Sequence, residues 1–460
     1  MLRESRPVLT EFHIGIDDTD SRLAGCTTYI AALIFQELVS QGFKPLDFPW
    51  LVRLNPNIPW KTRGNGALSL HFSVEEEELE EVKKVAVATV EHISDFAQRA
   101  TDPAVVFLKG RVSNPVREFS ARALYDVLSV REARWIAKCA RVEVHLLKGS
   151  RGLVGALASV GADFDHDHTF EIIAYRTSEN IGTTRKVSHD SVRHMDTVFR
   201  GLTFNNIDPE TGRVLICPHG PDPVLLGIRG EDPTSVARAF NQLEIDEPIE
   251  RVMIFKTNQG TDAHLSYHTR IQALRPYQSA VITGDVIDLP RTVRGGHVIF
   301  RIHDETGSID CAAYHATGSV RETTLQLAPG DSVTVSGGIR PRPPAELTLN
   351  VEKLEVTGLV HTVRLENPFC PSCRARCESM GKGQGFRCRK CKVRLPKTSR
   401  IQKAGHRTIS PGLYLPPPRT HRHLTKPASR YGINHSASLE TNGAIIDQAL
   451  ESLSVISMVP

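Results

Sequence analysis

The first 150 residues alternate between short apolar runs and segments with helical periodicity. One apolar run ends at Ile16, and after a polar loop the apolar side chains recur three and four residues apart, as in an amphipathic helix. These side chains are Ile30, Leu33, Ile34 and Leu38. Three further strand-like runs and a helical segment follow, at 50–54, 67–72, 105–108 and 117–130. The alternation predicts an α/β-type domain over residues 1–150.

The pattern changes after Gly152. Small apolar residues lead to a strand at 170–175, and the next segments read strand, strand, helix and strand. Their ranges are 213–217, 224–228, 233–243 and 251–257. This order, after an earlier strand and helix, predicts a ferredoxin-like α+β unit over 151–268.

Many short alternating strands, separated by turn residues, occupy residues 277–357. The pattern is typical of an OB-fold, a closed five-stranded barrel, which we assign to 269–362. Basic and aromatic side chains on this barrel suggest an RNA-binding face, although a barrel that only connects domains would look similar. The candidates for this face are Arg294, Phe300, Arg301, Tyr314, Arg340 and Arg342.

Two C-x-x-C pairs lie close together in a basic segment. Four thiolates at this spacing suit a tetrahedral zinc ion, and so short a segment could not fold without it. We therefore predict a structural zinc ribbon over 363–400, with Cys377 replacing Cys373 as the alternative ligand register. Such a closed site leaves no position for chemistry, so the module is expected to bind phosphates. The predicted ligands are Cys370, Cys373, Cys388 and Cys391.

The segment 401–460 contains a run of three prolines followed by many cationic side chains. It is either disordered or a basic arm that lies along RNA. Residues 440–458 have the pattern of a short terminal helix.

Length and charge fit a multidomain α+β protein with a polyanionic partner. A chain of 460 residues is too long for one core, and its formal net charge is only +4. The charge is uneven, however: 74–82 is acidic and 364–426 is strongly basic. The N-terminus has no signal-peptide core and no stretch reaches membrane-spanning length, so a cytoplasmic location is expected. Nine cysteines, an odd number, argue against a disulfide framework.

A carboxylate-rich loop follows the first strand. Asp17, Asp18 and Asp20 lie within four residues and repel one another unless a cation sits among them. Oxygen ligands on such a loop suit Mg²⁺ with nucleotide phosphates. The next helix starts near Thr27, and its N-terminus would favour an anion. The loop therefore suggests phosphoryl transfer, whereas a solvated Asx turn is the alternative.

A second loop of this domain also suits phosphates. Glycines in the stretch Arg63-Gly64-Asn65-Gly66 would let backbone amides approach a phosphate, and Lys61 and Arg63 add positive charge. A plain turn into a strand is the alternative. Lys109, after another predicted strand, is a further phosphate candidate. Neither familiar phosphate-binding signature is present, so ATP binding would use an uncommon set of loops.

Two loops of the second unit carry polar residues. The loop 218–223 contains three prolines that would hold His219 and Asp222 in fixed positions, as a ligand pocket requires, although stiff loops also occur for stability alone. The loop 163–168 mixes Asp and His and resembles a metal site, but such connecting loops are usually solvated.

Together these motifs resemble one family, the archaeal tRNA 2-agmatinylcytidine synthetases. The resemblance covers nearly the whole chain in one order and rests on short motifs, the OB-like region and the four-cysteine ribbon. The motifs are GIDDTDS, CTTY, RGNGA, TFNN, PHGPDPVLLGIRGE, NQGTD and YLPPPRTHRHLTKPASRYG.

The resemblance implies that the chain modifies the wobble cytidine of a minor isoleucine tRNA. The γ-phosphate of ATP would activate the C2 oxygen of cytosine, and the amine of agmatine would then displace phosphate, leaving AMP and two phosphates. The N-terminal domain would be an unusual kinase domain that also phosphorylates its own Thr27. The expected site residues are Asp17, Asp18 and Asp20 for catalysis and Mg²⁺, Arg63, Gly64, Asn65, Gly66 and Lys109 for ATP, and His219, Asp222 and Asp262 for agmatine.

Two other classes of function fit parts of the sequence. A tRNA-binding scaffold with an inactive N-terminal half would bind RNA without nucleotide turnover. A protein kinase would leave phosphate on Thr27 and none on cytidine.

Overall fold

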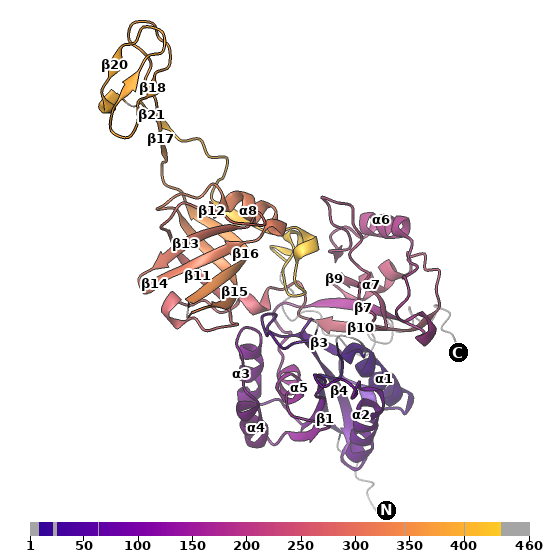
Figure 1. The fold of residues 1–460 in the computed structure, drawn as a ribbon. Helices are drawn as coiled ribbons and strands as arrows, with labels where there is room; N and C mark the ends of the chain where they lie inside the picture. Colours follow the sequence, from indigo (N-terminus) through magenta and orange to yellow (C-terminus); the bar gives the residue numbers. More distant parts are fainter. Residues whose placement is uncertain (1–8, 22–24, 63, 345, 400, 434–460) are drawn as a thin grey trace, which may run out of the picture.

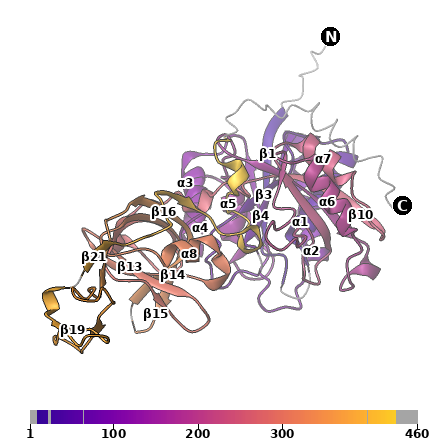
Figure 2. The ribbon, with the colours of Figure 1, turned by 90° about the horizontal axis from the view of Figure 1, so that it is seen from above.

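The structure, a computed structural model, describes residues 9–433 except 22–24, 63, 345 and 400. Two N-terminal units lie side by side, a β-barrel lies next to them, and a small ribbon projects from the far end of the barrel (Figures 1 and 2). The helix predicted over 440–458 lies outside the described residues.

The N-terminal unit is built on an antiparallel sheet between two layers of helices. Strand order is β6-β5-β1-β4-β3, and every pair within this set is antiparallel. The predicted alternation of strands and helices is thus present, and the kinase-like assignment of this unit stays a prediction. The strands are β1 (Leu9–Asp17), β3 (Trp50–Arg53), β4 (Gly66–Glu75), β5 (Ala104–Lys109) and β6 (Glu143–Leu146).

Apolar side chains on the two faces of this sheet bury different helices. On one face α1 and α2 pack in a core with Phe12, Ile14 and Leu70. On the other, α3, α4 and α5 pack against Val106 and Leu108. The segment predicted as one helix over 117–130 is helical only as far as Ala123, where α3 ends, and the next helix, α4, starts at Val130. The helices are α1 (Thr27–Ser40), α2 (Leu79–Ile93), α3 (Asn114–Ala123), α4 (Val130–Cys139) and α5 (Gly152–Val160).

The second unit has the element order β-α-β-β-α-β of the ferredoxin-like motif. Its sheet order is β10-β7-β9-β8, with antiparallel neighbours. The stretch 213–217, predicted as a strand, makes only an isolated bridge at Val214, and Thr203–Phe204 is paired instead. The elements are β7 (Thr169–Arg176), α6 (His189–Val198), β8 (Thr203–Phe204), β9 (Val224–Gly230), α7 (Pro233–Phe240) and β10 (Ile249–Thr257).

The two units share one sheet, and both contribute to the apolar core on one of its faces. Strand β10 pairs in parallel with β3, Lys256 opposite Trp50, so the nine strands named so far form one ten-stranded sheet together with the short β2 (Lys44–Pro45), which pairs with β4. Ile173 and Phe255 of the second unit belong to the same apolar core as α1. Helix α5, which lies beyond the predicted boundary at residue 150, packs on β1 of the first unit. The second unit also has a core of its own, which includes Phe170, Ile228 and Phe240, and the domain boundary at 150 stays a prediction.

The third unit is a closed five-stranded barrel, as the OB-fold prediction required. Its strands run β11-β15-β16-β14-β13, and pairing of β11 with β13 closes the barrel. Helix α8 (Ser319–Thr324) lies between β14 and β15. Phe300 is buried in the barrel core, so its expected place on an RNA face was wrong. The strands are β11 (Ser279–Val286), β13 (Val298–Asp304), β14 (Gly307–Ala313), β15 (Ser332–Arg342) and β16 (Glu346–Gly358).

Beyond the barrel, β17 (Val363–Glu366) and β21 (Ile401–Ala404) pair and carry the cysteine-rich ribbon. The chain then returns: β22 (Gly412–Tyr414) adds to β16, and the following residues pack on the second unit. Arg430 is fully buried there, with ion pairs to Glu231 and Asp167. Disorder, one of the two expectations for this arm, was therefore wrong for residues 412–433, whereas contact of the arm with RNA stays a prediction.

Candidate active site

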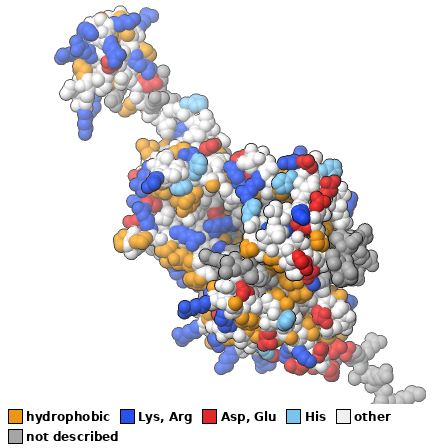
Figure 3. Space-filling model, turned by 45° about the vertical axis from the view of Figure 1, so that its right-hand side comes forward, with side chains coloured by type: hydrophobic (Ala, Val, Ile, Leu, Met, Phe, Trp, Pro, Cys, Tyr) orange, Lys and Arg blue, Asp and Glu red, His pale blue; other side chains and the backbone are white. Residues whose placement is uncertain are grey.

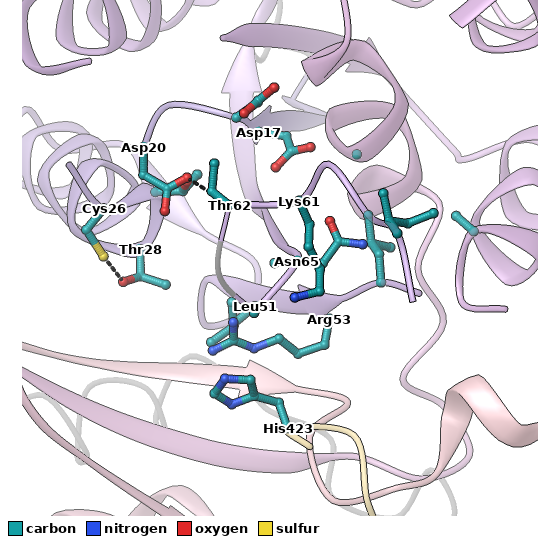
Figure 4. Close-up of a pocket in the computed structure, with 18 of the residues that line it drawn as sticks. Asp17, Asp20, Cys26, Thr28, Leu51, Arg53, Lys61, Thr62, Asn65 and His423 are labelled. Carbon is teal, nitrogen blue, oxygen red and sulfur yellow. Dashed lines mark hydrogen bonds between the residues drawn. The ribbon is translucent and has the colours of Figure 1, made fainter. Parts of the chain in front are cut away.

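One cavity of about 900 Å³ lies between the N-terminal unit and the ferredoxin-like unit. Figure 4 shows Asp17 and Asp20 on one side of it and Arg53 and His423 on the opposite side. The end of β1, the start of α1, the loop before β4 and strands β7 and β9 all contribute to its wall. The shared sheet fixes these elements relative to one another, so the cavity is built into the joint between the two units.

Asp17 ends β1 and lies directly beneath helix α5. A Cβ at Gly155 would overlap the Asp17 carboxylate, so only glycine allows the helix to pack this closely. Desolvation in this position, reinforced by the neighbouring Asp18 carboxylate, holds the pKa of Asp17 well above its ordinary value. The group therefore gains from any cation that enters the cavity.

Asp18 turns the chain out of the strand. Its φ is 59°, in the left-handed region that Asp and Asn tolerate best among side chains other than glycine. Arg151 reaches its Oδ2 at 2.6 Å from Nη2 and 2.8 Å from Nε. Burial nevertheless raises the pKa of Asp18 to about 6, with Arg151 opposing the shift. The carboxylates of Asp17 and Asp18 therefore keep their protons to a higher pH than solvated carboxylates do.

Arg151 is itself held in place by Asp102. The Asp102 carboxylate accepts bonds from the backbone N–H groups of Ser150 at 3.0 Å and Arg151 at 2.8 Å. The Asp102 N–H donates to the carbonyl of Asp18 at 3.1 Å. This pair of contacts ties the start of α5 to the aspartate loop.

The start of α1 faces the same cavity. Cys26, Thr27 and Thr28 line it, and the Cys26 side chain at the N-cap makes no capping hydrogen bond to the helix. The Thr27 hydroxyl accepts a bond from Thr19 at 3.1 Å. Backbone N–H groups at a helix start, together with the helix dipole, stabilise an anion. Thr27 therefore lies where a phosphate would be stabilised.

The glycine loop lies across the cavity from α1. Thr62 donates to Asp20 at 2.9 Å, which joins this loop to the aspartate loop. Gly64, Asn65 and Gly66 line the cavity as expected, together with Lys61. Arg63 lies outside the described residues. The two predicted phosphate loops therefore come together in space.

The opposite wall comes from the end of β3, the second unit and the C-terminal arm. Glu171 on β7 is buried and accepts a bond from Nε of Arg229 at 3.0 Å. Nδ1 of His423 lies 2.8 Å from Oε1 of Gln259, and burial lowers the pKa of His423 well below the ordinary value, so the ring is neutral. Burial also lowers the pKa of the Arg53 guanidinium, which lies in the same wall.

The three residues predicted to bind agmatine lie in different parts of the structure. Asp222 lines the cavity, buried, with Oδ1 3.2 Å from Nη2 of Arg185. His219 is exposed and contacts Arg213, and it is not among the cavity residues. Asp262 is also outside: it forms an ion pair with Lys353 of the barrel and accepts from the N–H of Lys426 in the arm at 2.8 Å. Asp262 thus joins the barrel to the arm, which makes it a structural residue.

Lys109 lies at the wrong end of its strand for a phosphate ligand. In the β1–β5 register it is opposite Phe12, whereas Asp17 is opposite Ala104. Five residues along a strand span about 17 Å. Lys109 is paired with Glu76 instead.

Several cavity residues were not predicted from the sequence. Arg53, Arg151 and Glu171 come from strands or helix starts with no motif of their own. His423 lies in the run of prolines and cations that was expected to bind RNA or be disordered. A search for polar residues at strand ends and helix starts would have found Arg53 and Arg151 but would not have placed them at one site.

The ribbon holds the second candidate site. Ligand atoms of Cys370, Cys373, Cys388 and Cys391 all lie within 4.8 Å of one another, as a tetrahedral zinc site requires. Cys377 is buried in the small core of the ribbon, outside this set, so the register with Cys373 is the one the structure has. Figure 3 shows Lys and Arg side chains gathered on the ribbon surface. The exposed ones include Lys382, Arg387, Arg389, Lys390, Lys392 and Arg394.

The barrel presents a smaller hollow of about 350 Å³. Asp310 lies beneath it, with Oδ1 2.7 Å from Arg301 and Oδ2 3.2 Å from Arg342. Tyr314 and Arg340 line the hollow, while Arg294 is exposed outside it.

The Asp and His loop at 163–168 serves the arm. Asp167 bonds Lys426 and Arg430 at 2.8 Å, and it is not part of a metal-ligand cluster among the described residues. Over the same described part of the chain, no helix is long and apolar enough to cross a bilayer.

Four family models match successive parts of the chain. In order, they describe the TiaS TCKD domain, the TiaS FLD domain, an OB-fold nucleic acid binding domain and the TiaS C-terminal zinc ribbon domain. The matched residues are 13–148, 150–264, 280–357 and 367–409.

Whole-length relatives agree with these models. The chain is 42% identical to the isoleucine tRNA 2-agmatinylcytidine synthetase TiaS of Pyrococcus horikoshii over 90% of its length and 96% of the relative. The chain is 40% identical to the synthetase of the same name from Methanosarcina mazei, over 91% of its length and 97% of the relative.

Solved structures of similar proteins have the same fold. A complex of TiaS with its isoleucine tRNA and ATP superposes with a TM-score of 0.81 at 36% identity, over 92% of this chain and 97% of that one. A complex of TiaS with the same tRNA, AMPCPP and agmatine superposes with a TM-score of 0.79 at 34% identity, over 92% of this chain and 98% of that one. Together with the family models and the relatives, these matches show that the chain belongs to the family of isoleucine tRNA 2-agmatinylcytidine synthetases (TiaS).

Proposed function

We propose that the chain attaches agmatine to the wobble cytidine of the minor isoleucine tRNA at the expense of ATP. The observation that carries this proposal is the shared cavity, where the aspartate loop and the start of α1 face two buried carboxylates of the second unit, Glu171 and Asp222. One side suits phosphates and a cation, and the other offers carboxylates, paired with Arg229 and Arg185, that can accept bonds from the guanidinium of agmatine. Relatives that bind an isoleucine tRNA, ATP and agmatine support the same assignment.

The chemistry requires activation of a poor leaving group. Transfer of the γ-phosphoryl group to the cytosine C2 oxygen makes phosphate the leaving group, and the neutral amine of agmatine then attacks C2. The transfer leaves ADP, and attack of the amine releases the first phosphate; hydrolysis of the β-phosphoryl group of ADP by one water molecule would supply the second phosphate, so the proposed products from the nucleotide are AMP and two phosphates. In this scheme the N–H groups at the start of α1 and Lys61 hold phosphate oxygens, while Asp222 binds the guanidinium end of agmatine.

Magnesium fits the aspartate loop. Its carboxylates are desolvated and their pKa values are raised, so a divalent cation would relieve an unfavourable charge cluster. Mg²⁺ in nucleotide sites is commonly held by one or two carboxylates and by the phosphates. When bound there, the ion would neutralise charge on the triphosphate.

Two further assignments complete the proposal. Phosphorylation of Thr27 itself is included, since its hydroxyl lies at the helix start where a phosphate would be stabilised. In the ribbon, a structural zinc ion on the four cysteines completes the cofactor set.

Labelled agmatine provides the direct test. Incubation of the protein with the unmodified isoleucine tRNA, ATP and Mg²⁺ should place label in the RNA, with AMP released in proportion. Asp222→Asn should raise the KM for agmatine more than it lowers kcat. Asp190→Asn is the matched control, because Asp190 is exposed on α6 and lies outside the cavity.

The same assay separates the alternatives. Tight binding of tRNA with no release of AMP would establish a scaffold instead of an enzyme. Phosphate that appears on Thr27 while the RNA stays unmodified would identify a protein kinase.

A further inference from the structure

The loop between β3 and β4 joins the cavity to the barrel. Its base is fixed: Asn55 donates from Nδ2 to the carbonyl of Tyr277 at 2.9 Å, and the carbonyl of Asn57 accepts from Nη1 of Arg340 at 2.9 Å. Arg422 of the C-terminal arm donates to Oδ1 of Asn57 at 2.8 Å. Both asparagines are fully buried. Three parts of the molecule therefore set the position of this loop.

The tip of the loop presents a tryptophan to solvent. Trp60 lines the cavity, yet its exposed fraction is 50%, so it lies at the mouth. Trp50, by contrast, is anchored in the fold through Nε1, which donates to Asp47 at 2.9 Å. Trp135 is 63% exposed, but it lies on α4 and outside the cavity lining. Trp60 is thus the tryptophan whose indole can meet a ligand that enters the cavity.

The loop also lies on the way from the barrel to the cavity. Arg340, which holds its base, lines the barrel hollow together with Tyr314 and Arg342. An RNA strand that follows the arginines of the barrel toward the aspartate loop would pass the tip at Trp60. Next to the indole, Lys61 lies in the cavity lining and supplies charge for the RNA backbone.

We propose that Trp60 is a stacking platform for the RNA base next to the modified cytidine. This inference rests on the proposed function, because it assumes that an unpaired cytidine enters the cavity. Proteins that read single-stranded RNA stack splayed bases on aromatic side chains, and an indole at a cavity mouth offers the required flat apolar face. Asp17, half-buried beneath α5, is less exposed than Trp60 at the mouth, so the reacting base passes the platform while its neighbour remains on it.

Tryptophan fluorescence and binding test the contact. In a Trp135→Phe background, addition of a transcript of the isoleucine tRNA should quench the exposed emission, whereas ATP alone should leave it unchanged. Trp60→Ala should raise the Kd for the transcript by about tenfold, consistent with the loss of one stacked base. Trp60→Phe should restore most of the affinity, and Trp135→Ala should bind like the parent.

A transcript with an abasic site beside the wobble cytidine identifies the partner base. Loss of that base should weaken binding to the parent chain by about the same factor as Trp60→Ala, and should cost the Trp60→Ala variant nothing further. Any of three results would overturn the proposal. They are an equal loss of affinity for the abasic transcript in the parent and in Trp60→Ala, an unchanged affinity of Trp60→Ala for the intact transcript, and quenching of the tryptophan emission by ATP alone. These are binding measurements, so they do not depend on catalysis. If Trp60 and the base are coupled but the protein fails to incorporate agmatine, the proposed function is refuted and the contact between Trp60 and the base still stands.

Discussion

Asp18 combines an unusual backbone conformation with a buried charge, and both affect the choice of variant. At φ 59° an asparagine is tolerated as well as an aspartate, whereas alanine would add strain. We predict that Asp18→Asn abolishes agmatine incorporation, because the loop loses the charge that positions cation and phosphates. Affinity for tRNA should change little. Turnover and RNA binding measured on the same preparation check this, and an active variant would contradict the metal role.

The same substitution should stabilise the protein without ligands. Burial raises the pKa of Asp18 from 3.8 to about 6, so between these values the folded chain keeps a proton that the unfolded chain has lost. Stability therefore falls as the pH rises through this window, and the loss is complete above about pH 6. Asp18→Asn should remove this loss, so the free energy of unfolding should rise by about 1–3 kcal/mol at pH 7 and hardly change at pH 4. Denaturant titrations of both proteins at several pH values give the difference.

At the scale of elements, helix α5 depends on one glycine. Helix propensity alone predicts that Gly155→Ala stabilises by up to about 1 kcal/mol. The Cβ would overlap the Asp17 carboxylate, however, so we predict destabilisation by about 1–3 kcal/mol and loss of activity. Thermal unfolding and the agmatine assay measure both effects. Gly358→Ala, at a strand end where the added Cβ has ordinary contacts, should be neutral in both.

The C-terminal arm is an element held by buried charge. Arg430 bonds Glu231 and Asp167 at 2.8 Å and is fully buried, so Arg430→Met would leave two carboxylates without this cation. We predict a loss of about 3–5 kcal/mol. Amide exchange over 412–433 should become faster, and turnover should fall because His423 lies on the same segment.

An exposed pair serves as the control for this prediction. Arg193→Met removes an ion pair with Asp190 on the surface of α6 and should change stability by less than about 1 kcal/mol. Unchanged exchange over 412–433 in the Arg430 variant would show that the arm is held by other contacts.

At the scale of the whole molecule, the ribbon should be separable from the cavity. Removal of zinc by a zinc-selective chelator, with Mg²⁺ kept in excess, should unfold the cysteine module, because its core is only a few residues, while the proposed ATP-dependent labelling of Thr27 continues. Affinity for tRNA should fall, since the exposed cations of the ribbon lose their arrangement.

Metal analysis checks the ligand set. Cys388→Ser should lose zinc, whereas Cys377→Ser should retain one ion per chain, because Cys377 is outside the set of four. Loss of labelling on Thr27 after chelation would show that the two parts are coupled.

Local patterns were read correctly where the chemistry is local. The C-x-x-C spacing and the alternation within each barrel strand are set inside short segments, without help from the rest of the chain. The aspartate loop lines the cavity, and its role in binding Mg²⁺ stays a prediction. The errors arose where a residue's role depends on distant partners. Lys109 looked like a phosphate ligand, but strand register turned it toward Glu76. The arm looked solvated because the partners of Arg430, Glu231 and Asp167, lie 199 and 263 residues away in sequence.

By itself the sequence determined the four modules, the zinc ligands and the family, because each depends on spacing within short segments and on motif order. Only the tertiary structure decided that the first two units share one sheet, that Asp222 but not Asp262 reaches the cavity, and that the arm brings His423 to its wall. These outcomes follow from strand register and from pairing of buried charges across the chain. Such contacts leave no mark in the local sequence. The same pattern of buried residues is compatible with several strand registers, and the same cation could pair with any of several carboxylates.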